Sequence, residues 1–231
     1  ATITGLYRLD EPDPACAGHP TLSNLLSQLR EGYDILYLVA HGKVMEGQPW
    51  LWLENEAGGF HMVTTEETPA PVTGQTVGLR TRLDQLSRLP RLAVLASCQS
   101  AGEADVWASR DRGQLSALGP ALVRAGVPAV LAMQGNVTMD SLALFVPRFF
   151  HELHRDGQID RAVAAARTEL DLHGRHDWWM PVLYMRLESG QLAIGEQAAA
   201  LGPFMPAELR GIVLRTILMD RVVPLLLDGG G

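Results

Sequence analysis

A histidine and a cysteine in this chain of 231 residues each follow a short, strongly apolar run. Residues 35–40 lead directly into His41, and residues 92–96 are followed by Ser97 and Cys98. An imidazole close to a thiol can accept its proton and so produce the thiolate, which is the nucleophilic form of cysteine. The pair is therefore a candidate for covalent catalysis by acyl transfer.

The two apolar runs are expected to be strands of one parallel sheet. Both are short, rich in leucine and β-branched residues, and lack polar alternation, which is typical of strands buried on both faces. Ligands of such sheets bind beyond the carboxyl ends of the strands, and His41 and Cys98 follow those ends. We therefore expect the two side chains to meet in space although they lie far apart in the sequence.

The rest of the chain alternates between strand and helix patterns, which predicts an α/β fold: a three-layer α/β/α sandwich with a mostly parallel central sheet. A small β-hairpin is expected after the strand that leads to His41. The further strands are predicted at residues 2–7, 50–54, 60–63, 128–133 and 181–187. Helices are predicted at residues 21–31, 79–86, 115–125, 141–153 and 159–172, with residues 209–219 as a further helix candidate.

Composition limits the classes of function. With 47% hydrophobic and 19% charged residues, the chain is expected to form one globular domain over residues 1–231. Lys and Arg number 19 against 26 Asp and Glu, so the net charge of -7 disfavours direct binding of nucleic acid. Two cysteines provide no disulfide framework, and we expect a reducing, cytoplasmic environment.

Neither membrane insertion nor a secretory signal is predicted. The most apolar long stretch, residues 212–227, is interrupted by Arg215, Asp220, Arg221 and Pro224. The chain begins at Ala1 in the middle of an alternating strand pattern. We therefore expect it to be an excised or processed part of a longer protein.

Other chemistries have little support. His151 and His154, and likewise His173 and His176, are three residues apart, but neither pair forms a His-Glu-x-x-His zinc motif, so no metal is expected. Nucleotide-binding and serine-hydrolase motifs are missing from the sequence, and no cofactor is expected. The tryptophans are interpreted as hairpin and edge packing instead of a base-stacking platform, because basic residues are scarce around them; they are Trp50, Trp52, Trp178 and Trp179.

Several segments together resemble the CHAT domains, which are related to the caspase-like cysteine peptidases such as caspases, separases and gingipains. The resemblance covers roughly residues 21–187. It differs from caspases at one point: Ser97-Cys98-Gln99-Ser100 does not match Gln-Ala-Cys-x-Gly, so aspartate specificity is not implied. The similar segments are residues 33–42, 95–102, 125–134, 149–153 and 162–167.

The resemblance implies a cysteine endopeptidase with a protein or peptide substrate. Cys98 would attack the amide as a thiolate, and His41 would transfer the proton to the leaving amine. The backbone N–H groups of Gly42 and Cys98 would bind the oxyanion. Such domains occur in longer chains with helical repeats, so a regulatory region or partner outside this segment is expected.

Asp140 is the candidate for substrate specificity. In the related separases and gingipains an acidic side chain in this region binds a basic P1 residue, and Asp140 follows the strand predicted at 128–133. An alternative is that Asp140 caps the helix that begins at Ser141. With a basic P1, Arg110 and Arg112 in the exposed loop predicted at 102–114 become conceivable self-cleavage sites, although simple solvation also explains them.

Two other functions remain open at this point. A CHAT domain without catalysis could act as a protein-interaction or signalling module. The same dyad could also perform acyl transfer or amide hydrolysis on a small molecule. Reactivity of the Cys98 thiol distinguishes the silent module from the enzymes, because an inert buried thiol should react no faster than Cys16.

Overall fold

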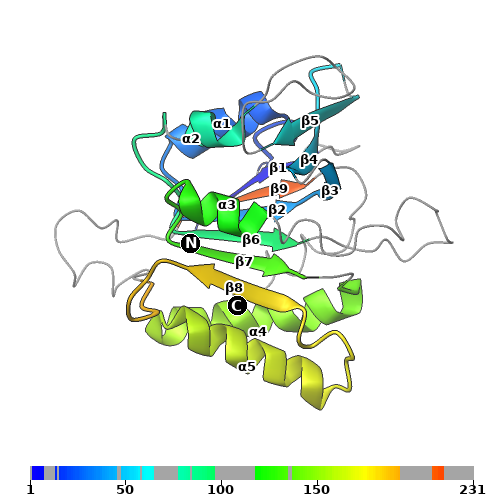
Figure 1. Cartoon of the computed structure of the whole chain (residues 1–231), viewed down its shortest axis with the longest axis vertical. Coiled ribbons are helices and arrows are strands. Elements are labelled where there is room, and N and C mark those ends of the chain that lie inside the picture. Colours follow the sequence, from blue (N-terminus) through cyan, green and yellow to red (C-terminus); the bar gives the residue numbers. More distant parts are fainter. Residues whose placement is uncertain are drawn as a thin grey trace, which may run out of the picture.

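The fold is described from a computed structural model (Figure 1), which describes residues 2–7, 14, 16–45, 48–57, 59–64, 78–83, 85–96, 118–134, 137–192 and 210–215. Its strands are β1 Thr2–Leu6, β2 Ile35–Val39, β3 His41–Met45, β4 Gln48–Glu54, β5 Phe60–Thr64, β6 Leu92–Ala96, β7 Ala129–Met133, β8 Pro181–Met185 and β9 Arg210–Arg215. Its helices are α1 Leu22–Arg30, α2 Leu79–Leu83, α3 Leu118–Arg124, α4 Met139–Asp156 and α5 Ile159–Leu172. The described helices include none that is long and apolar enough to cross a membrane.

The larger sheet has the strand order β1-β9-β2-β6-β7-β8. All neighbouring pairs run parallel except β7 and β8, which are antiparallel, so β8 is an antiparallel edge strand. Every residue of β2, β6 and β7 is buried. Continuous apolar runs form these central strands because helices cover both faces of the sheet and leave no solvent-facing side.

Helices pack on both faces of this sheet, as the sequence predicted. One face packs against α1, α2 and α3 with side chains such as Leu36 and Leu38 of β2. The opposite face places the alternate side chains Ile35, Tyr37 and Val39 against the core that includes α4 and α5. In Figure 1, α1 and α2 lie near the top of the view, α3 lies beside the middle strands, and α4 and α5 lie at the bottom. The three-layer α/β/α sandwich with a mostly parallel sheet is thus confirmed.

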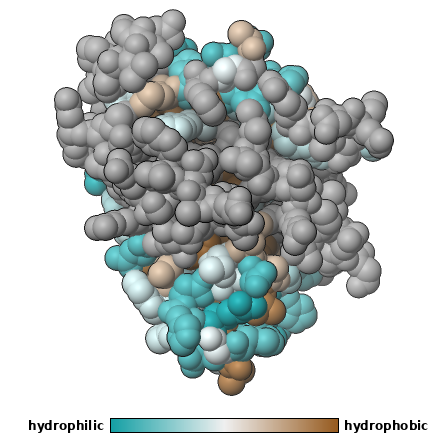
Figure 2. All heavy atoms as spheres, turned by 90° about the vertical axis from the view of Figure 1, so that its right-hand side faces the viewer, coloured by the Kyte–Doolittle hydropathy of each residue, from teal (hydrophilic) through white to brown (hydrophobic). Residues whose placement is uncertain are grey.

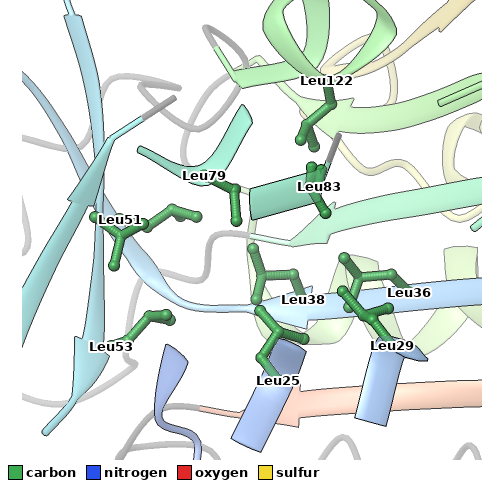
Figure 3. A pocket seen from close by; sticks show the side chains of 10 residues that line it. Leu25, Leu29, Leu36, Leu38, Leu51, Leu53, Leu79, Leu83 and Leu122 are labelled. Atoms are coloured by element: carbon green, nitrogen blue, oxygen red, sulfur yellow. The ribbon is translucent and has the colours of Figure 1, made fainter. Parts of the chain in front are cut away.

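The smaller sheet has three antiparallel strands in the order β3-β4-β5. The predicted hairpin corresponds to β4 and β5, and β3 precedes it as an additional strand. Figure 3 shows Leu51 and Leu53 of β4 pointing toward leucines of α1, α2 and β2 around a small apolar cavity. Because β3 pairs with β4, this leucine cluster positions the strand that begins with His41 relative to the main sheet.

Asp34 connects the amino-terminal ends of β2 and β6. Its buried carboxylate pairs with Arg88 and lies 3.6 Å from the guanidinium of Arg91. Its backbone carbonyl accepts hydrogen bonds from the N–H groups of Arg91 and Leu92. Burial lowers the pKa of Arg91, and the charge of Asp34 opposes this shift. These contacts join the first residues of β2 and β6 and so set the register of the two strands.

One predicted element is wrong. The helix candidate at residues 209–219 contains a strand, β9, which pairs in parallel with β1 on one side and β2 on the other. Gly211, Ile212 and Val213 are glycine and β-branched residues, which favour a strand once two neighbours supply backbone hydrogen bonds. The predicted helices at 79–86 and 115–125 are present as the shorter α2 and α3. The loop expected at 102–114, with Arg110 and Arg112, lies outside the described residues.

Candidate active site

The carboxyl ends of β2, β6 and β7 lie side by side at one edge of the sheet (Figure 1). Val39 of β2 is paired with Ala96 of β6, and these are the last residues of their strands. His41 comes two residues after Val39, and Cys98 comes two residues after Ala96. The two strands are neighbours, about 4.8 Å apart in a regular sheet. The register therefore places side by side the ends of the two strands that precede His41 and Cys98 in the sequence.

Only the backbone of His41 is described, and Cys98 lies outside the described residues. Their roles as base and nucleophile, and that of the Cys98 N–H in an oxyanion site, stay predictions. The other cysteine, Cys16, is partly buried, and its Sγ lies 3.3 Å from the carbonyl oxygen of Tyr7. Cys16 is bridged to Gly5 of β1, and β9 and β2 lie between β1 and β6, so Cys16 provides an internal reference thiol away from the end of β6.

The chain enters a new strand directly at His41. After Ala40 it begins β3, in which His41 is paired with Trp52 and Gly42 with Leu51. Because β3 is an edge strand, its successive N–H groups point alternately toward β4 and away from it. One of the two adjacent N–H groups at positions 41 and 42 thus faces away from β4 and takes no part in the β3–β4 ladder. The role of Gly42 itself stays a prediction.

Asp140 lies in the first turn of α4, which follows the end of β7. Its side chain is 75% exposed, and its Oδ2 lies 3.5 Å from Nη1 of Arg175. The alternative that Asp140 caps this helix is wrong: the helix begins at Met139, and Thr138 is the cap, with its hydroxyl accepting the N–H of Ser141 at 3.2 Å. An acidic residue in the first turn also interacts favourably with the helix dipole.

A buried aspartate joins the start of α4 to the segment before β8. Asp177 accepts the backbone N–H of Thr138 at 3.0 Å and the hydroxyl of Ser141 at 2.7 Å. Ser141 is fully buried, and Asp177 is nearly so. Buried polar groups with this many partners hold a single conformation, because each broken bond would leave an unsatisfied group. The network therefore fixes the segment between α5 and β8 beside the carboxyl end of β7.

This segment presents two tryptophans, Trp178 and Trp179, shortly before the edge strand β8. Trp50 is 3% exposed, as packing predicts, whereas Trp178 and Trp179 are 41% and 49% exposed.

The histidines considered as metal ligands lie on α4 and in the segment that follows α5. His151 and His154 are exposed on α4, and His173 is exposed after α5, with Nδ1 2.8 Å from the carbonyl oxygen of Glu169. Across the described ranges, no group of three or more His, Cys, Asp or Glu side chains is placed to hold a metal ion.

A mostly parallel sheet between two helical layers, with an antiparallel strand at one edge, is the architecture of the caspase-like fold. A model of the CHAT domain family matches residues 9–187, which is more than half of the chain. The chain therefore belongs to the CHAT domain family, which is related to the caspase-like cysteine peptidases. The match extends from before α1 to just after β8. A comparison with curated proteins finds no match.

Proposed function

We propose that this chain is a cysteine endopeptidase in which Cys98 is the nucleophile and His41 is the acid/base. The main support is the pairing of Val39 with Ala96, which brings together the ends of the two strands that lead to these residues in the sequence. Family membership adds a relation to cysteine peptidases. Every residue of β2 and β6 is buried. Polar and reactive residue types follow both strands in the sequence, at the strand ends where α/β proteins bind substrates.

The proposed reaction is amide hydrolysis through a thioacyl-enzyme. The Cys98 thiolate attacks the carbonyl carbon of the scissile amide, and the oxyanion accepts hydrogen bonds from the N–H groups of Gly42 and Cys98. The C–N bond breaks as His41 protonates the leaving amine. His41 then takes a proton from water, which attacks the thioester and releases the carboxylate and the thiol. The substrate in this proposal is a protein or peptide, and a regulatory region outside this segment controls access to it.

We further propose that Asp140 binds a basic P1 side chain. Asp140 is exposed and follows β7, the neighbour of the strand that leads to Cys98. Its carboxylate already lies 3.5 Å from a guanidinium nitrogen of Arg175, so the site accommodates a planar basic group. A substrate Arg or Lys would share this carboxylate with Arg175 or displace it.

A positional peptide library tests the peptidase and its P1 preference together. We expect the wild-type chain to cleave the library with a preference for Arg or Lys at P1, and Asp140→Asn to reduce that preference about tenfold, the loss of one charge-assisted contact. Arg175→Ala is the matched variant and should retain or increase the preference, because it removes the competing guanidinium. A preference unchanged in Asp140→Asn would exclude Asp140 from the pocket. Failure of the wild type to cleave any peptide would favour the non-catalytic interaction module.

A further inference from the structure

We propose that β1 and β2 form a strand-acceptor site, which binds an extended apolar segment parallel to β2, and that β9 is the exchangeable occupant of this site. The basis is the strand order of the main sheet, the anchoring of β1 by contacts that do not involve β9, and the position of β9 in the sequence. Binding at this site does not depend on the proposed peptidase function.

The strand order places β9 between β1 and β2. It runs parallel to both strands, with five paired positions on each side, and Figure 1 shows it in orange between them. The family model matches residues 9–187, so β1 and β9 both lie outside the matched residues, and β2 is the edge strand of the matched part of the sheet. An edge strand presents unpaired N–H and C=O groups, with which a further strand can pair.

β1 is held in place by contacts that do not involve β9. The hydroxyl of Tyr33 donates to Oγ1 of Thr4 at 2.7 Å, and Leu6 is fully buried in the core cluster that includes the leucines of α1. On the side of β1 away from β9, the N–H of Ala17 donates to the carbonyl of Gly5 at 2.7 Å. These contacts keep β1 two strand spacings from β2, roughly 10 Å, which is the width that one inserted strand requires.

β9 depends on this site for its structure. Its partner β1 lies at the other end of the chain, and residues 186–209 separate it from β8, so no tight turn ties β9 to the strand before it. Its central residues, Ile212, Val213 and Leu214, are apolar and favour a strand once backbone partners are present. In strand addition, main-chain hydrogen bonds supply most of the affinity. The same sequence on a separate molecule should therefore compete with the resident strand.

Occupancy of the site acts on β2. The whole of β2 pairs with β9, and the last pair joins Val39 to Arg215. On its other side, Val39 pairs with Ala96 of β6. Exchange of β9 therefore changes the support of the strand that leads to His41. A partner that presents such a strand would regulate the peptidase through β2, and this consequence, unlike the binding itself, rests on the proposed function.

A fluorescent peptide with the sequence of residues 209–216 tests the site, with its binding to the full chain measured by anisotropy. In the full chain with Val213→Pro, the proline removes a backbone donor from the resident strand. This chain should bind the peptide about tenfold more tightly than the wild type, in which β9 occupies the site. The reversed sequence should bind to neither chain, and it controls for apolar surface patches, a few of which Figure 2 shows in its lower part, over α4 and α5. Equal affinity of the two chains, or equal binding of the reversed peptide, overturns the proposal.

Hydrogen exchange shows where the peptide binds. In Val213→Pro, amides of β2 should exchange about tenfold faster than in the wild type and regain their protection when the peptide is added. Strand β7 does not contact β9 in the strand order, so its amides should stay protected and verify the fold. If β7 also loses protection, the milder Val213→Gly takes the place of the proline variant. Peptide binding that leaves β2 unprotected overturns the site, whether or not any chain cleaves peptides.

Discussion

Replacement of His41 by alanine is expected to lower kcat/KM for peptide cleavage by about 10²–10⁴-fold, the usual contribution of a positioned acid/base. The loss follows because the thiol keeps its proton and the leaving amine receives none. The fold should persist, since His41 takes part in β3 through its backbone pairing with Trp52. Steady-state cleavage of the best library peptide measures the effect, and circular dichroism verifies the fold.

The matched control for this variant is His151→Ala. His151 is exposed on α4, so its loss changes the histidine count without touching the sheet edge where β2 and β6 end. We expect wild-type cleavage from it. If His41→Ala cleaved as fast as His151→Ala, the His41 imidazole would have no part in catalysis. The neighbouring ends of β2 and β6 would then not mark a catalytic dyad.

Asp34→Ala is expected to lower the free energy of unfolding by about 3 kcal/mol, the scale found when one partner of a buried ion pair is removed. The carboxylate is buried and pairs with Arg88 and Arg91, and Arg91 is itself largely buried. Without Asp34, that guanidinium would remain in the interior with less compensation for its charge. Urea unfolding followed by circular dichroism measures the change.

Arg161→Ala is the control for the stability prediction. It removes an ion pair with Asp156 of 2.9 Å, but Arg161 is 62% exposed. Exposed pairs contribute at most about 1 kcal/mol, so this variant should stay close to wild type. An equal decrease in the free energy of unfolding for the two variants would mean that Asp34 does not hold β2 and β6 together.

The central sheet could be predicted because its strands carry their own signal. Residues 35–39, 92–96 and 129–133 are continuous apolar runs, and only strands covered on both faces suit such runs at this length. The long helices were equally clear. Leu142, Phe145, Phe149 and Leu153 recur at helical spacing in α4, and all four are buried.

Strands β9 and β3 could not be predicted, because their formation depends on neighbours that are distant in the sequence. β9 is a strand through its pairing with β1 and β2, and nothing near residues 210–215 in the sequence encodes that contact. β3 begins at His41 with the polar and small residues His41-Gly42-Lys43, so it lacks an apolar pattern. It becomes a strand because β4 supplies a partner.

The candidate site was predicted in part. Two strand ends were expected at one edge, and the structure places β2 and β6 side by side with Val39 opposite Ala96. The predicted start of α4, Ser141, was wrong by two residues, because the helix begins at Met139. Thr138 takes the cap position instead of Asp140, and its hydroxyl accepts the N–H of Ser141. The Asp177 contacts with Thr138 and Ser141 were not predicted, because they join residues far apart in the sequence.

The most direct test of the proposed peptidase is the reaction of its thiols with a peptidyl chloromethyl ketone that carries Arg at P1, followed by peptide mapping. The chain has two cysteines, so Cys16 is an internal control in the same sample. We predict one adduct, at Cys98, formed at least tenfold faster than any at Cys16 and slowed by His41→Ala. Reaction of Cys98 no faster than Cys16, with no effect of His41→Ala, would contradict the proposed catalytic dyad.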